Sequence, residues 1–156
     1  MAFQLDKFLL AILIGFVIVL VFFVLLSLFP PLQQGARITQ SSVYWRGIAR
    51  PFHVLSHENA GNGTLSLVIQ NSEPERLTLT GLRVAGFNST SPALPIDLFA
   101  GEKTQIVMHG GYLACAPGLA YSISSREITF SYIESDGLDK VQGFDGYSKD
   151  LVGLCQ

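Results

Sequence analysis

Histidine and cysteine are the residue types in this sequence best suited to catalysis or metal binding. The chain contains three histidines and two cysteines. His53 and His57 stand four residues apart, the spacing of a metal site on a helix, but no cluster of carboxylates or cysteines accompanies them. A bound zinc ion takes three or four such ligands. We therefore interpret both as loop histidines exposed to solvent, with His109 isolated from them, and we expect no metal site.

The acidic and hydroxyl residues of the C-terminal third form no catalytic pattern that we recognise. Ser124, Ser125, Arg126 and Glu127 are adjacent, and Asp136 and Asp139 follow them. A calcium loop needs a ladder of acidic ligands, and a phosphate-binding loop needs a glycine-rich turn between a strand and a helix. Neither is present. The sequence predicts a protein that is not an enzyme, with no catalytic residues, no cofactor and no small-molecule substrate.

The two cysteines, Cys115 and Cys155, lie in the C-terminal part of the chain. Such a pair in a small exported domain predicts one disulfide, and two buried free thiols are the alternative. No Cys-x-x-Cys motif favours a redox role. A bond between them would close a loop of about 40 residues and stabilise the fold by roughly 3 to 4 kcal/mol.

Two glycosylation sequons occur in the same part of the chain. They begin at Asn62 (Asn-Gly-Thr) and Asn88 (Asn-Ser-Thr), both in contexts typical of turns. A sequon can carry a glycan only on the surface of an exported protein. Together with the cysteine pair, the sequons predict an extracytoplasmic glycoprotein with both asparagines at solvent-facing turns.

The N-terminal segment differs from the rest of the chain in its apolar composition. From Phe8 to Phe29 it is apolar apart from Gly15 and Ser27, and as a helix it would extend about 33 Å, enough to cross a hydrocarbon core of about 30 Å. The run is long for a cleaved secretion signal and only Lys7 precedes it as a basic side chain, although cleavage stays open. We predict a transmembrane or filament-core helix that inserts into the membrane before assembly.

The rest of the chain of 156 residues has room for one domain of ordinary size. Pro30 and Pro31 should end or kink the apolar helix, and residues 32–60 are polar without a sustained apolar period. The predicted organisation is a hydrophobic helix over 1–31, a stalk over 32–60 and a head over 61–156. The net charge of −2, with scattered basic residues, excludes nucleic acid as a partner.

In the head, apolar residues alternate with polar ones, which predicts half-buried strands. Residues 71–75 supply a turn, Gly81 shifts the alternation as a bulge would, and Asp-Gly at 136–137 predicts a hairpin. The predicted strands are 64–70, 77–84, 94–99, 103–109, 126–133, 138–144 and 151–155. The predicted fold class is α+β, a long N-terminal hydrophobic helix followed by a small antiparallel β-sandwich of about seven strands.

An apolar N-terminal helix, a polar stalk, the run GTLSLVIQNSEPERLTLTGLRVAG and the closing REITFSYIESDGLDKVQGFDG before LVGLCQ resemble archaeal type IV pilin-like proteins. The resemblance implies a homo-oligomeric helical filament at the cell surface, with helices in the core, β-heads outside and a membrane-anchored precursor. It implies packing between subunits through aromatic residues of the helix, namely Phe8, Phe16, Phe22, Phe23 and Phe29.

The residues before Phe8 depart from the family pattern, because MAFQLDK has no clear Gly or Ala junction and only Asp6 as an acidic candidate. The chain is then either a processed pilin or a permanently anchored relative. The alternative function is a single-pass cell-surface protein whose β-sandwich binds a neighbour, and a membrane-tethered enzyme is a third hypothesis. A leader junction would favour the pilin, whereas exposed aromatic residues on one sheet face would favour the binding module.

Overall fold

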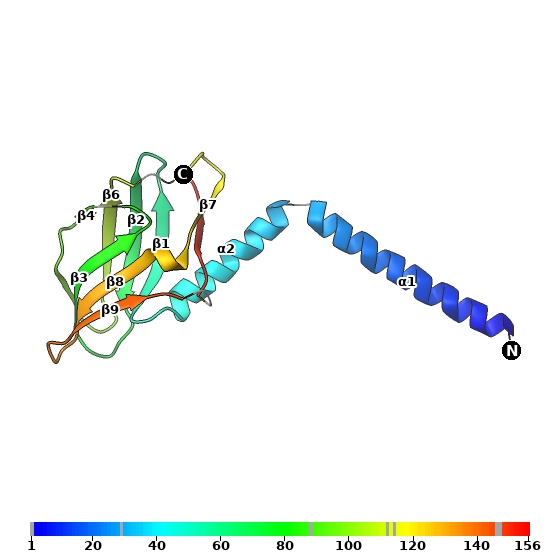
Figure 1. Cartoon of the computed structure of the whole chain (residues 1–156), viewed down its shortest axis with the longest axis horizontal. Coiled ribbons are helices and arrows are strands. Elements are labelled where there is room, and N and C mark those ends of the chain that lie inside the picture. The colour runs from blue at the N-terminus through cyan, green and yellow to red at the C-terminus, as the bar shows by residue number, and fades with distance from the viewer. Residues whose placement is uncertain (1, 29, 88, 112, 114, 146–147) are drawn as a thin grey trace. The chain divides into compact units, whose positions relative to one another are not determined.

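The structure is a computed structural model that describes residues 2–28, 30–87, 89–111, 113, 115–145 and 148–156. Side chains are described within these ranges except at 2–8, 26, 28, 30–32 and 89. The chain forms two compact units, Met1–Ala36 and Arg37–Gln156. The described strands all lie in the second unit, and Figure 1 shows them in green to red. Residues 48–156, which contain these strands, are here called the head.

Two helices precede the strands, α1 (Ala2–Leu28) and α2 (Pro30–Gly47). Proline fits the start of α2 because the first backbone N–H groups of a helix have no intrahelical partner. Further along, Ser41 and Trp45 are each 1% exposed and stand four residues apart. This spacing puts them on one face, and that face packs on the head.

The strands form three antiparallel sheets with the orders β1-β2-β6-β4, β5-β3-β8-β9 and β10-β7. Their bounds are β1 (Phe52–Asn59), β2 (Thr64–Asn71), β3 (Leu77–Val84), β4 (Ser89–Ser91), β5 (Ile96–Leu98), β6 (Lys103–His109), β7 (Ala120–Ile123), β8 (Ile128–Ile133), β9 (Asp139–Gly143) and β10 (Leu151–Leu154). A short 3-10 helix, η1 (Ser125–Glu127), precedes β8.

The hydrophobic core lies between the two four-stranded sheets (Figure 1). On β2, Leu65, Leu67 and Ile69 are at most 1% exposed and alternate with partly exposed residues, as expected for a strand with one buried face. Phe52 of β1 meets Phe130 of β8 with ring centroids 5.2 Å apart. This contact joins the two sheets, and the architecture is a β-sandwich.

The small β10-β7 sheet lies beside β1. A parallel bridge pairs Asn59, the last residue of β1, with Cys155. The N–H of Gln156 also donates to the carbonyl of Asn59 at 3.2 Å. The C-terminal strand therefore continues the first sheet at its β1 edge.

Two local predictions are confirmed. The pairing of β3 with β8 shifts register between Leu79 and Gly81, where the sequence predicts a bulge. β8 and β9 form the predicted hairpin, closed by the Gly137 N–H donating to the Glu134 carbonyl at 3.0 Å. Gly137 has φ 83°, a left-handed conformation that glycine adopts without steric cost.

The predicted fold class is wrong in its single long hydrophobic helix and in its number of strands. Instead of one long hydrophobic helix and about seven strands, the described residues form two helices and ten strands. Helical structure resumes at Pro30 because proline suits a first helical turn, and α2 extends because one of its faces is buried by the head.

Three strands were missed for local reasons. β1 lies in the segment predicted to be a stalk, and a register shift between Val54 and Ser56 interrupts the alternation that would have revealed it. β4 has 3 residues and β7 has 4, too few to show a period of two.

The sequence also predicts a transmembrane helix over Phe8 to Phe29. Among the residues that the structure describes, no helix combines the length and the apolar character needed to cross a membrane.

Candidate functional site

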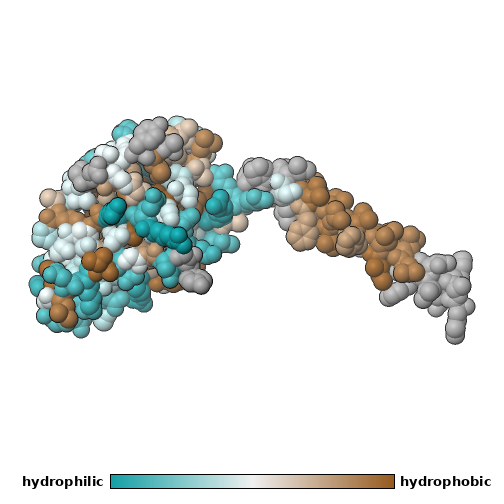
Figure 2. Space-filling view, in the orientation of Figure 1, coloured by the Kyte–Doolittle hydropathy of each residue, from teal (hydrophilic) through white to brown (hydrophobic). Residues whose placement is uncertain are grey.

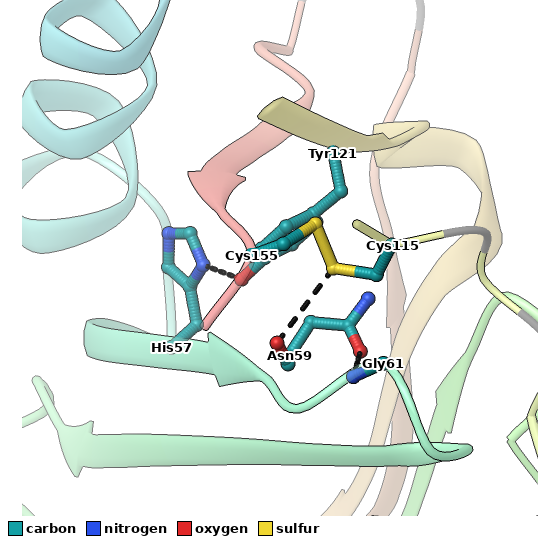
Figure 3. Close-up of a disulfide and its surroundings, with 6 residues drawn as sticks. All are labelled: His57, Asn59, Gly61, Cys115, Tyr121 and Cys155. Atoms are coloured by element: carbon teal, nitrogen blue, oxygen red, sulfur yellow. Dashed lines mark hydrogen bonds between the residues drawn. A yellow bond between two sulfur atoms is a disulfide. The ribbon is translucent and has the colours of Figure 1, made fainter. Parts of the chain in front are cut away.

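The predicted disulfide is confirmed. Cys115 and Cys155 are bonded, with their Cα atoms 5.5 Å apart (Figure 3). Cys115 comes from the loop between β6 and β7, and Cys155 follows β10. The bond therefore fastens the C-terminal strand to the head.

The end of β1 supports this bond. The Oδ1 atom of Asn59 accepts from the Gly61 N–H at 3.0 Å, and the Asn59 carbonyl oxygen lies 3.7 Å from the Cys115 sulfur (Figure 3). Gly61 has φ 73°, and a Cβ there would lie 2.9 Å from the Cys115 carbonyl oxygen. Only glycine allows the chain to pass so close to the disulfide.

His57 and Tyr121 form the most perturbed titratable pair in the part of the chain that the structure describes. The His57 Nδ1 and Tyr121 Oη atoms lie 2.5 Å apart (Figure 3). Burial and the nearby Arg46 charge lower the pKa of His57 to about 4. Burial, with the Glu58 carboxylate, raises the pKa of Tyr121. Tyr121 therefore keeps its proton and uses it to donate a hydrogen bond to Nδ1 of a neutral His57, whose Nε2 carries the ring hydrogen.

Gly153 of β10 completes this cluster. It pairs with Tyr121 in the small sheet, and a Cβ at Gly153 would lie 2.7 Å from His57 Cε1 and 2.8 Å from Tyr121 Oη. The two rings thus pack directly on the glycine backbone. β1, β7 and β10 meet here.

The predicted exposure of the two histidines in a loop is wrong, because both lie on β1. His57 is only partly exposed, and the Nε2 atom of His53 is buried without a hydrogen-bond partner in the structure. His109 is exposed at the end of β6. The described residues contain no group of three or more His, Cys, Asp or Glu side chains that could hold a metal ion.

Acidic side chains near the β8-β9 hairpin have local structural roles. Asp136 Oδ1 accepts from the Leu138 N–H at 3.0 Å, and Glu134 pairs with Lys140 at 2.6 Å. Asp139 opens β9, and Ser125 to Glu127 form η1. Ser125 is buried, and its N–H donates to Asp150 Oδ1 at 3.2 Å.

The second half of α2 is bound to the segment around β10. Ser41 Oγ accepts from the Val152 N–H, and the Trp45 Nε1–H donates to the Lys149 carbonyl, both at 2.9 Å. Trp45 also meets Phe144 edge to face at a centroid distance of 4.8 Å. Sequence reasoning missed this attachment.

A cavity of about 300 Å³ opens between α2, β1 and β10. Arg46, Glu58 and His57 contribute polar groups to its wall, and Trp45 and Val54 contribute apolar ones. Because the wall mixes polar and apolar groups, it does not indicate one chemical class of ligand. The cavity marks where α2 lies against the head.

The first predicted sequon is on the surface, since Asn62 is exposed in the bend between β1 and β2. Asn88 lies outside the described residues.

Among the described residues, α1 carries a long run of exposed apolar side chains. Exposed fractions are 64% for Phe16, 58% for Phe22 and 65% for Phe23, and the side chains of Phe8 and Phe29 lie outside the described set. Figure 2 shows the described part of α1 almost entirely in the colour of apolar residues. The other exposed apolar side chains of this helix are Leu9, Leu10, Ile12, Leu13, Ile14, Val17, Ile18, Val19, Leu20, Val21, Val24 and Leu25.

Because consecutive helical residues point about 100° apart, these side chains cover every face of the helix. A helix that is apolar all round is normally buried on all sides. We take 9–25 of α1 as the candidate assembly site. No protein-family model matches this chain, and no curated protein shows a significant match to it.

Proposed function

We propose that this protein is a structural subunit of an extracellular, type IV pilus-like filament, in which α1 helices of many copies pack together and the β-heads form the outer surface. The observation that carries the proposal is the candidate assembly site, whose apolar side chains are exposed on every face of the helix. Such a surface needs several neighbours, and copies of the same helix supply them.

The energy of such packing is ample. Burying roughly 400 Å² of apolar surface per subunit is worth about 10 kcal/mol before the cost of ordering the subunits. Identical head-to-tail contacts that do not close into a ring generate an open helical filament. No covalent link between subunits is needed.

The head suits the outside of such a filament. The Cys115–Cys155 disulfide is typical of proteins in oxidising surroundings. Asn62 is exposed on a turn, which is where a glycan can be attached. We therefore propose a cell-surface location and a glycan at Asn62.

The test is assembly of the purified full-length chain. Detergent is removed by dilution, and negative-stain electron microscopy followed by helical reconstruction shows what forms. We expect filaments with α1 in the core. Discrete particles whose α1 remains in detergent or lipid would reject the filament and favour the anchored binding module.

A matched pair of variants makes the test specific. Phe16 of α1 and Phe99 of the head are each 64% exposed. Phe16→Ser should raise the protein concentration needed for assembly at least tenfold, because it removes buried apolar surface from every subunit. Phe99→Ser should leave that concentration nearly unchanged. Equal effects of both variants would contradict a special role for α1.

A further inference from the structure

The last residues of the head, 148–156, touch both the disulfide and α2, and we call them the C-terminal strap. At its end, Cys155 is bonded to Cys115, and its N–H donates to the Leu119 carbonyl at 2.9 Å. The N–H of Gln156 donates to the carbonyl of Asn59. The strap is thus fastened at Cys155 to two separate parts of the head.

The earlier part of the strap holds α2. Besides the bonds from Ser41 to Val152 and from Trp45 to Lys149, the Tyr44 hydroxyl donates to Ser148 Oγ at 2.9 Å. These three hydrogen bonds attach one face of α2. Trp45, which makes one of these hydrogen bonds, is 1% exposed.

Between these two attachments the strap pairs with one strand of the described structure, β7, and its Leu151 side chain is buried. β10 pairs with β7 over four residue pairs, from Leu151 with Ile123 to Leu154 with Ala120. A two-stranded sheet of this length is marginal without other support. The main core is different, because Leu67, Ile69 and Phe130 are buried between two four-stranded sheets. In the described structure the backbone of the strap joins these sheets through its last two residues, by the bridge of Cys155 with Asn59 and the hydrogen bond from the Gln156 N–H.

We infer that the C-terminal strap is a redox-sensitive latch: reduction of Cys115–Cys155 frees the strap and releases α2 from the head, while the two four-stranded sheets stay folded. This inference concerns the head alone and does not rest on the proposed function. A filament could form without the latch, and the latch could operate without a filament.

The chemistry requires a dithiol reductant. A thiolate of the reductant attacks a disulfide sulfur, the bond between the cysteines breaks, and a mixed disulfide forms. The second thiol of the reductant then attacks this mixed disulfide and displaces the protein cysteine from it. The cysteines end as two thiols, and the reductant ends as a cyclic disulfide. Cys115 is partly exposed whereas Cys155 is 5% exposed, so attack begins at Cys115.

Trp45 is a built-in reporter, because it is the only tryptophan in the chain. The oxidised full-length protein is purified in detergent and treated with dithiothreitol, and tryptophan emission, acrylamide quenching and amide hydrogen exchange are followed. We expect emission to move to longer wavelength and quenching to increase several-fold. Amide exchange in α2 from Ser41 to Trp45 should accelerate at least tenfold, while β2 and β6 keep their protection.

The variant Cys115→Ser/Cys155→Ser should show the released state without reductant and should not respond to dithiothreitol. If that variant does not fold, reduction of the purified oxidised protein still decides the matter. The latch is refuted if Trp45 stays buried after complete reduction, which would make the disulfide a simple staple. It is equally refuted if β2 and β6 lose protection together with α2, because the strap and the core would then be one cooperative unit.

Discussion

The Tyr121 hydroxyl donates a hydrogen bond to His57 Nδ1 across 2.5 Å and so links β7 to β1. The two residues are 64 positions apart in the sequence. Their rings meet at 83° with centroids 5.7 Å apart, and Gly153 of β10 lies against both. Burial disfavours the charged form of both side chains, so protonation of His57 should weaken this junction.

The pH dependence of stability should therefore carry a contribution from His57. Its pKa is 6.5 in an unfolded chain and about 4 in the fold. Below pH 6.5 the unfolded state binds more protons, so the contribution is fully present above that pH and is lost progressively down to about pH 4. The loss should reach at most about 3 kcal/mol.

Urea unfolding from pH 4 to 8 measures this effect when the native protein is compared with His57→Gln. Carboxylates and His53, whose pKa is lowered by burial and by Arg50, titrate in both proteins. The difference between the two curves isolates His57. Parallel curves would show that His57 is free to protonate in the folded state.

Gly153→Ala tests the packing of the same junction. The added methyl group would meet His57 and Tyr121 at under 3 Å, and overpacking of this kind costs about 1 to 3 kcal/mol. Gly143→Ala on β9 is the matched control, because nothing lies within 4 Å of its Cβ position. Thermal unfolding should show a lower midpoint for the first variant and little change for the second.

Asn71→Ala should be among the most destabilising single changes in the head. The Asn71 side chain is fully buried, donates to the carbonyls of Glu75 and Leu98, and accepts from the Glu73 N–H. Removing it leaves three backbone groups without these partners, at a cost of about 2 to 4 kcal/mol. Asn62→Ala, at an exposed position, should change the unfolding free energy by less than about 0.5 kcal/mol. Equal losses would mean that water replaces the Asn71 side chain.

Local sequence signals predicted several features of the fold correctly. The Gly81 bulge and the hairpin at Gly137 depend on neighbouring residues, and the disulfide follows from there being two cysteines. The attachment of α2 could not be predicted in this way, because Ser41 bonds to Val152, 111 residues away. The pairing of His57 with Tyr121 is also long-range, and the bulge in β1 hid the strand that carries His57.

A charge in the middle of α1 gives the last test of assembly. Val19 of α1 and Val43 of α2 are 52% and 61% exposed in the isolated chain. If the proposal is right, Val19 is buried among apolar helices in the filament, so Val19→Arg places an unpaired charge there at a cost of about 3 to 5 kcal/mol per subunit. Repeated at every subunit, this cost should abolish filaments, whereas Val43→Arg should still assemble. Sedimentation with electron microscopy of the pellet measures both variants, and unchanged filaments from Val19→Arg would show that α1 is not in the filament core.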